Sequence, residues 1–255
     1  MGQALFIIGP AGSGKTTFCK NLYTYGTMIN RTFKVINLDP ANINDDFNYY
    51  SDIREYITVD EVQENTDLGP NGSLLLSLQE MYDNIEELEL DSFTDDFLVF
   101  DCPGQIELFL HSDILNDIIN YTNKYMKSVV VYLMDSFFLI DSYKFIFGYL
   151  TAYISSVKFN VPRLNVITKL DLIEENIDLD MIHEQVKNEL LSKKDKYGKL
   201  ALRIYDFLEE NESINFIKMN WDDEDVLNDF LYSIDMLTEY CEDNETKTNY
   251  PEDYD

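Results

Sequence analysis

A glycine-rich stretch near the start of the chain constrains the fold more than any other feature. An apolar run at residues 4–8 leads into a loop that fits the phosphate-binding pattern G-x-x-x-x-G-K-[ST], and a helical pattern follows at 16–25. In such a strand–loop–helix unit, backbone N–H groups and the helix N-terminus point at one anion. The pattern predicts a site for a nucleoside triphosphate. In it, Lys15 reaches the β/γ oxygens and the Thr16 hydroxyl ligates Mg²⁺. The loop residues assigned to this site are Gly9, Gly12, Ser13, Gly14, Lys15, Thr16 and Thr17.

Short apolar runs alternate with helical patterns along the rest of the chain. Further buried strands are predicted at residues 33–38, 97–100, 128–134, 164–168 and 214–219. Helices are predicted at 74–88, at 172–207 with a break near 193–196, and around 226–237. This alternation requires a mostly parallel sheet with crossover helices. We therefore expect an α/β fold of the P-loop NTPase type, a three-layer sandwich with helices on both faces of the sheet.

Composition excludes several classes of function. The formal net charge of −29 over 255 residues argues against direct nucleic-acid binding and against anionic membranes. His111 and His183 lie far apart, and Cys19, Cys102 and Cys241 are scattered, so neither a metal-binding set nor a disulfide framework is predicted. With no apolar stretch of membrane-spanning length and no secretory leader, a cytoplasmic protein is expected. Residues 242–255 are predicted to form an acidic disordered tail after one domain spanning 1–241.

A second nucleotide motif follows the predicted strand at 97–100. Asp101 and Gly104 fit a D-x-x-G switch, in which the aspartate holds Mg²⁺ through water and the glycine N–H meets the γ-phosphate. Gln105 and Glu107 come next and are candidates to orient or deprotonate the attacking water. Asp39, after the second predicted strand, is another candidate base. Asp39 and Glu107 each have a structural alternative. Asp39 also fits a turn that precedes a proline, and Glu107 fits an ordinary acidic residue in the first turn of a helix.

The segment T-K-L-D closes the strand at 164–168. Asp171 there can accept hydrogen bonds from guanine N1–H and the N2 amino group together, whereas adenine presents an acceptor at N1. Lys169 can lie along the plane of the base. The fuller motif is N-K-x-D, and this chain has Thr168 in the first position. The segment predicts that the nucleotide is a guanine nucleotide.

The segment Gly69, Pro70 and Asn71 carries no nucleotide chemistry by itself. From the residues alone, the simplest interpretation is a turn in which Asn71 or Ser73 caps the helix that follows.

Taken together, these motifs resemble the GPN-loop GTPases. The matching segments are G-P-A-G-S-G-K-T at 9–16, N-L-D-P-A at 37–41, G-P-N at 69–71, D-C-P-G-Q-I-E at 101–107 and T-K-L-D at 168–171. Within the family, D-I-R-E at 52–55 and D-C-P at 101–103 look closest to the third of three eukaryotic paralogue groups. The resemblance implies a GPN-loop insertion near 60–90 within the domain, and it implies that the protein hydrolyses GTP to GDP with Mg²⁺.

The resemblance also implies partners. Members are dimers in which the Gly-Pro-Asn loop of one subunit reaches the phosphates of the other, which would bring Asn71 to the γ-phosphate or to released phosphate. Asp39, Gln105 and Glu107 fall at family positions tied to the switches and the attacking water. Either a homodimer or a heterodimer with a paralogous GPN-loop GTPase fits. Eukaryotic members are linked to the assembly and nuclear import of RNA polymerase II, which implies RNA polymerase II subunits as partners and possible shuttling to the nucleus.

Three alternatives stay open. A partitioning-type ATPase would carry a lysine directly after Gly9, where this chain has Pro10. A nucleoside kinase would need a cluster of lid arginines, and the chain has four arginines in all. A nucleotide-binding assembly factor with negligible turnover would show the same motifs. A hydrolysis assay on dimeric protein is the measurement that separates it from a GTPase.

Overall fold

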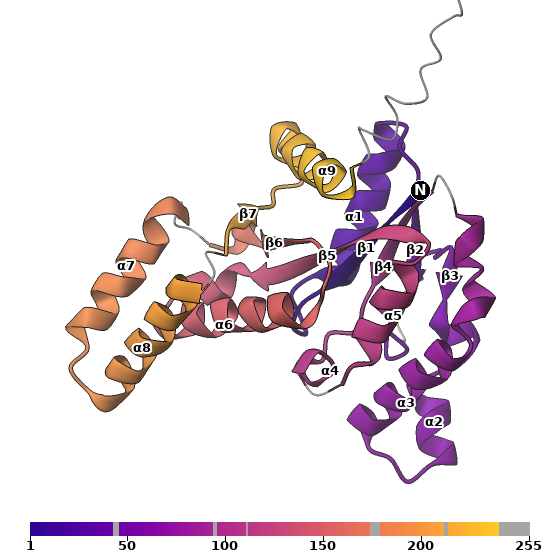
Figure 1. Cartoon of the computed structure of the whole chain (residues 1–255), viewed down its shortest axis with the longest axis horizontal. Helices are drawn as coiled ribbons and strands as arrows, with labels where there is room; N and C mark the ends of the chain where they lie inside the picture. Colours follow the sequence, from indigo (N-terminus) through magenta and orange to yellow (C-terminus); the bar gives the residue numbers. More distant parts are fainter. Residues whose placement is uncertain (43–45, 94–95, 111, 174–178, 212–213, 240–255) are drawn as a thin grey trace, which may run out of the picture.

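The structure, a computed structural model, describes residues 1–42, 46–93, 96–110, 112–173, 179–211 and 214–239. In this part of the chain, seven strands form one sheet in the order β3-β2-β4-β1-β5-β6-β7, and every pairing is parallel (Figure 1). The strands are β1 Gly2–Ile8, β2 Phe33–Asn37, β3 Ser51–Asp52, β4 Phe97–Asp101, β5 Met126–Asp135, β6 Arg163–Thr168 and β7 Phe216–Lys218.

Helices connect most of the strands. They are α1 Lys15–Met28, α2 Val59–Asn65, α3 Pro70–Asp83, α4 Ile106–Leu110, α5 Ile114–Thr122, α6 Ser142–Lys158, α7 Leu179–Ser192, α8 Lys196–Asn211 and α9 Glu224–Thr238. Short 3₁₀ turns lie at η1 Ile53–Glu55, η2 Ile85–Leu88, η3 Leu90–Ser92, η4 Ser136–Leu139 and η5 Leu170–Leu172. The elements α2, α3, η2 and η3 all lie between β3 and β4.

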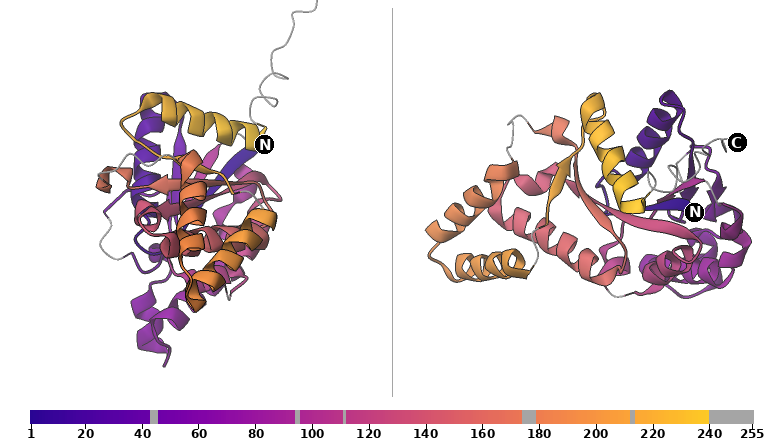
Figure 2. Two further views of the ribbon diagram at one scale, coloured as in Figure 1. Left: turned by 90° about the vertical axis from the view of Figure 1, so that its left-hand side faces the viewer. Right: turned by 45° about the horizontal axis from the view of Figure 1, so that its top comes forward.

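The sheet separates two hydrophobic cores, because alternate residues of each strand point to opposite faces. On one face Leu5 and Ile7 of β1 pack with α1 and α9. On the other face Phe6 of β1 belongs to a core cluster that also contains residues of α3, α5, α6, α7 and α8. Figure 2 shows α1 and α9 on one side of the sheet, and the α7–α8 pair projecting beyond its β7 end. The expected three-layer α/β fold is confirmed.

The parallel arrangement gathers the motifs at one edge of the sheet. The carboxyl ends of parallel strands all lie on the same side, and ligands bind in the crevice beyond them. The loop after the central strand β1 therefore lies at the same edge as Asp101 in the adjacent strand β4. Asp39 after β2 and Lys169 after β6 lie at this edge too, each following a strand two positions from β1.

Some element boundaries differ from the expected ones. The helix expected over 74–88 ends at Asp83, and Ile85–Leu88 is a separate 3₁₀ turn. Asp and Asn are poor helix formers because their side chains compete for the backbone, which explains a break at Asp83 and Asn84. Leu74, Leu78 and Ile85 are nevertheless buried in the core, as the apolar periodicity predicts. The two-residue strand β3 was not predicted, and β7 is shorter than the expected 214–219 strand.

Several expectations fall outside the described residues. The acidic tail at 242–255, Cys241 and His111 belong to this group, and their predictions stay predictions. Within the residues that are described, every helix is too short or too polar to cross a membrane.

Candidate nucleotide-binding site

The loop between β1 and α1 forms a compact turn around the N-terminus of α1. Gly14 is the N-cap of the helix and has a φ of 90°, a left-handed conformation that glycine adopts without strain. Gly9 and Gly12 also have positive φ angles. The Ser13 N–H donates to the Pro10 carbonyl at 3.1 Å and closes the turn. The predicted phosphate loop therefore has the backbone conformation that its glycines allow.

Lys15 lies inside this loop. Its Nζ donates to the Pro10 carbonyl at 3.2 Å, and the residue is 8% exposed. Burial lowers the pKa of Lys15, while the charges of Asp101 and Asp39 act in the opposite direction. A Cβ atom on Gly104 would lie 2.5 Å from Lys15 Nζ, so the glycine of the D-x-x-G motif packs against the lysine. The structure thus brings the first two motifs into contact.

A cavity of about 510 Å³ opens over the N-terminus of α1. It contains a lysine, hydroxyl groups, a carboxylate and an amide, which is a suitable lining for a triphosphate and its attacking water. Asp39 and Gln105 both line it. The lining residues are Ala11, Gly12, Gly14, Lys15, Thr16, Thr17, Asp39, Ala41, Asn42, Leu74, Gly104, Gln105 and Lys169. We call this cavity the phosphate half of the site.

Three residues supply oxygen donors near Lys15. Thr16 and Asp39 line the phosphate half, and Asp101 is buried at the end of β4, where its charge acts on Lys15. Hydroxyl and carboxylate oxygens, combined with phosphate oxygens, are the ligands that Mg²⁺ takes in nucleotide sites. Among the described residues, no group of three or more His, Cys, Asp or Glu side chains is placed to hold a metal ion. The hydroxyl of Thr16 and the carboxylates of Asp39 and Asp101 fit an Mg²⁺ ion whose other ligands come from a phosphate.

A second cavity of about 910 Å³ adjoins the first, and both are lined by Gly14, Thr17 and Lys169. Its other lining includes Asp171 of η5 and, from the connection between β7 and α9, Asn220, Trp221 and Asp222. We call this cavity the base half. Trp221 and Asp222 were not predicted as site residues. The signal for them in the sequence was the strand predicted at 214–219, because its carboxyl end had to meet the same edge of the sheet.

Thr168 and Lys169 connect the base half to the phosphate loop. Thr168 Oγ1 donates to the Ser13 carbonyl at 2.8 Å. Lys169, with a φ of 60°, places its Nζ on the Gly12 carbonyl and 2.8 Å from Asp135 Oδ2. A threonine in place of the usual asparagine therefore still provides a side-chain donor to the phosphate loop.

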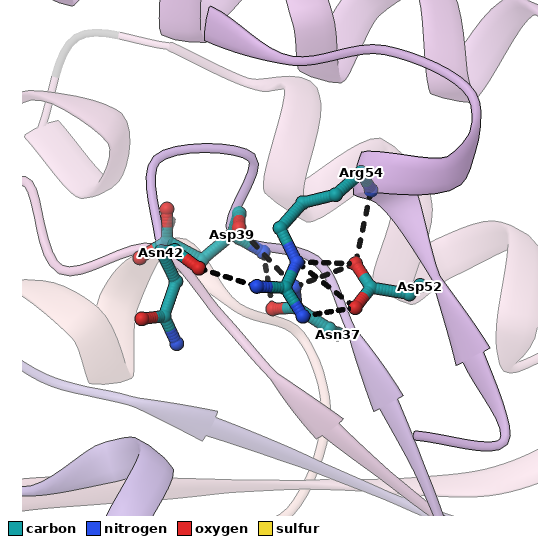
Figure 3. A network of polar contacts seen from close by, with 5 residues as sticks. All are labelled: Asn37, Asp39, Asn42, Asp52 and Arg54. Carbon is teal, nitrogen blue, oxygen red and sulfur yellow. Dashed lines mark hydrogen bonds and ion pairs between the residues drawn. The ribbon is translucent and has the colours of Figure 1, made fainter. Parts of the chain in front are cut away.

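The loop with Asp39 approaches the phosphate half from the β2 side (Figure 3). Asp39 Oδ1 accepts from the Ala41 N–H at 3.0 Å. Burial raises the pKa of Asp39, although the charges of Lys15 and Arg54 oppose this shift. A carboxylate with a raised pKa is a better proton acceptor, as a general base requires.

Seven predicted site residues line neither cavity. Three of them, Gly9, Ser13 and Asp101, are buried, and the other four are exposed. Glu107 is exposed in the first turn of α4. Gly69, Pro70 and Asn71 are exposed at the start of α3. The N-cap of α3 is Gly69 and has no side-chain capping bond, with Pro70 as the first helical residue. The expectation that Asn71 or Ser73 caps this helix is therefore wrong. The helix begins one residue before Asn71, and the Ser73 hydroxyl donates instead to the Gly69 carbonyl.

Comparisons with known proteins agree with the motifs. A family model described as "Conserved hypothetical ATP binding protein" matches residues 7–240. GPN-loop GTPase 3 of Danio rerio is 35% identical over 257 residues, which cover 96% of this chain and 90% of that protein. GPN-loop GTPase 3 of Xenopus tropicalis is 36% identical, with the same coverage of 96% and 90%. GPN-loop GTPase 3 of Saccharomyces cerevisiae is 30% identical over 95% of this chain and 94% of its own length.

A solved structure shares the fold. The chain superposes with a TM-score of 0.74 on a crystal structure of a GTPase in apo form from Pyrococcus abyssi, at 20% identity. The match covers 94% of this chain and 98% of that one. At this identity the likeness concerns the fold, and it extends over nearly the whole chain.

Proposed function

This chain belongs to the GPN-loop GTPases, and from that premise we propose that it acts as a dimeric, Mg²⁺-dependent switch driven by GTP hydrolysis. Its GTPase class follows from its relatives. One observation supports the assignment of the site: the phosphate half and the base half adjoin at Gly14, Thr17 and Lys169. A single nucleotide placed there would have its phosphates at Lys15 and its base at Asp171.

The geometry supports a division of roles in hydrolysis. Lys15 balances charge on the β/γ-phosphates. Gly104 packs against Lys15, and its N–H would donate to the γ-phosphate. Gln105 orients the attacking water through its amide, and Asp39 accepts the proton that the water loses. Bound Mg²⁺, held by Thr16 and through water by Asp101, would neutralise phosphate charge. Glu107 stays a candidate that this geometry does not favour.

We propose that Asn71 acts in the site of a second subunit. It is exposed, it makes no capping bond, and it lies outside both cavities of its own chain. An amide at a helix start is a good donor to a phosphate. The resemblance to dimeric family members assigns this loop to the partner's phosphates, and the exposure of the loop agrees with that assignment.

Replacing Asn71 with alanine is expected to slow GTP hydrolysis on the order of 100-fold, as the loss of one transition-state donor does. GTP affinity and thermal stability should stay near wild type. In a mixed dimer with Lys15→Ala protein, one of the two sites keeps both loops intact. That site combines the phosphate loop of the Asn71→Ala subunit with the Gly-Pro-Asn loop of the Lys15→Ala subunit. About half the wild-type rate per mixed dimer is therefore expected. The measurement is phosphate release from purified mixed dimers.

Asn188→Ala is the matched control, because Asn188 is an exposed asparagine within α7. It should hydrolyse GTP at the wild-type rate. Mixed dimers that form and show no recovery would contradict action across the interface. Wild-type dimers with negligible hydrolysis would favour the alternative, a nucleotide-binding assembly factor without turnover of its own.

We propose further that the switch assists the assembly or nuclear import of RNA polymerase II, with polymerase subunits as clients, and that the protein is cytoplasmic and shuttles to the nucleus. Membership of the family supports this proposal. In cells whose only copy carries Lys15→Ala, the largest polymerase subunit is expected to accumulate in the cytoplasm, because the switch cannot load GTP. Fluorescence microscopy of that subunit measures the effect. Normal nuclear levels in these cells would contradict the proposal, and cells with Lys187→Ala should resemble wild type.

A further inference from the structure

The loop from Asp39 to Asn42 is fixed at both ends by side chains from neighbouring elements (Figure 3). At its start, Asn37 Oδ1 accepts from the Asp39 N–H at 2.9 Å, and Asn37 Nδ2 donates to the Asp39 carbonyl at 3.3 Å. At its end, Arg54 Nη1 donates to the Asn42 carbonyl at 2.6 Å. The position of Asp39 thus depends on Asn37 and Arg54.

A single carboxylate joins these two side chains. Asp52 Oδ1 accepts from Asn37 Nδ2 at 2.8 Å and from Arg54 Nε at 2.9 Å. Asp52 Oδ2 accepts from Arg54 Nε at 2.9 Å and also from Arg54 Nη2. Burial pushes the pKa of Asp52 upward, but the hydrogen bonds from Arg54 and Asn37 outweigh it, and the pKa is lowered. The ionised form is therefore the one that the network stabilises.

The local sequence builds this arrangement. The two-residue strand β3 pairs with the end of β2 and sets Asp52 directly opposite Asn37. Asp52 then caps η1 by accepting from the Arg54 N–H at 2.9 Å, which turns the arginine back toward the same carboxylate. An arginine fork suits this task, because it can hold a carboxylate with two donors while a third reaches a carbonyl.

The Asp52–Arg54 pair, which we call the clamp, and the phosphate half lie on different sides of the loop. Asp39, Ala41 and Asn42 line the phosphate half. Asp52 and Arg54 line a separate cavity, together with Pro40, Glu55 and Thr58. Arg54 therefore reaches the reacting phosphate only through the loop that it holds.

We propose that Arg54, held by Asp52, is a positioning residue for GTP hydrolysis: it fixes the Asp39–Asn42 loop against the phosphate half and sets the turnover of bound GTP rather than its affinity. The inference rests on the proposed role of Asp39. Affinity comes from the phosphate loop and the base half, which the clamp does not touch. Turnover depends on the placement of the base, and a shift of about 1 Å can cost on the order of 100-fold.

Arg54→Gln and Asp52→Asn each test the proposal. Both are expected to lower kcat on the order of 10- to 100-fold while the Kd for a fluorescent GTP analogue changes less than about 3-fold. Rates are counted per nucleotide-binding site, so that misfolded protein does not contribute. Arg31→Gln is the matched control, because Arg31, in the connection between α1 and β2, forms a similarly buried ion pair with Asp235 of α9. It should lose stability and keep its kcat.

A double variant separates the inference from the role of Asp39. Asp39→Asn should be slow, and Arg54→Gln added to it should slow it no further, because both changes remove the same function. If Asp39→Asn keeps the wild-type kcat, the proposed base is wrong. If Asp39→Asn is slow but Arg54→Gln and Asp52→Asn turn over like wild type, or lose affinity as much as kcat, the positioning role is overturned.

Discussion

Replacing Lys15 with alanine is expected to weaken GTP binding by about 10- to 150-fold, because a hydrogen bond to a charged group contributes about 1.5–3 kcal/mol. The fold should be retained. Lys15 is buried, and burial lowers its pKa. In the nucleotide-free protein, burial of the charged lysine therefore costs folding free energy, and alanine removes this desolvation cost. A thermal transition at or above that of the wild type is therefore expected for the nucleotide-free variant.

Trp221 offers a direct measurement of this effect. It is the sole tryptophan of the chain and it lines the base half, so its fluorescence should change when a nucleotide binds. Titration of that signal with GTP gives the affinity of each variant. Lys187→Ala is the control, since Lys187 is half exposed on α7 and pairs with Asp206 at 3.5 Å. Wild-type affinity in the Lys15 variant would remove the phosphate-loop assignment.

Replacing Asp171 with asparagine is expected to weaken GTP binding by about 100-fold or more. The hydrogen bond from the guanine N2 amino group would be lost, and the bond from N1–H would no longer end on a charged oxygen, at about 1.5 kcal/mol or more each. Xanthosine triphosphate should gain affinity instead, because its ring presents an oxygen where guanine has the N2 amino group, and the asparagine amide can donate to it. Competition of GTP, ATP and xanthosine triphosphate against a fluorescent analogue measures all three affinities.

Asp222 provides a matched control within the same cavity. It is exposed, it lines the base half, and Asp222→Asn makes the same chemical change. This variant should keep its preference for GTP. A switch to xanthosine triphosphate in Asp222→Asn and not in Asp171→Asn would move the guanine contact to the β7–α9 connection. Equal affinity of the wild-type protein for ATP and GTP would agree with the description of the matching family model and would contradict the guanine assignment.

The sequence by itself was sufficient for the fold and for the edge of the sheet at which the motifs meet. Strand and helix periodicities are local, so residues 4–8, 97–100 and 128–134 could be recognised as buried strands without any knowledge of their neighbours. Once the sheet is parallel, its carboxyl edge has to collect the phosphate loop, Asp101 and Thr168. The prediction of Asn71 as a helix cap failed on a local detail, because Gly69 takes the cap position and Pro70 begins the helix.

The tertiary structure decided which side chains meet. Thr168 and the Ser13 carbonyl are 155 positions apart, and Asn37 and Asp52 are 15 apart, and no periodicity links either pair. Asp52 and Arg54 carried no predicted role, since an Asp-x-Arg segment is ordinary until a two-residue strand sets it beside Asn37. Residue patterns along the chain thus determined which motifs meet at the carboxyl edge of the sheet. Contacts between distant segments, which depend on strand order and register, decided how the side chains at that edge are held.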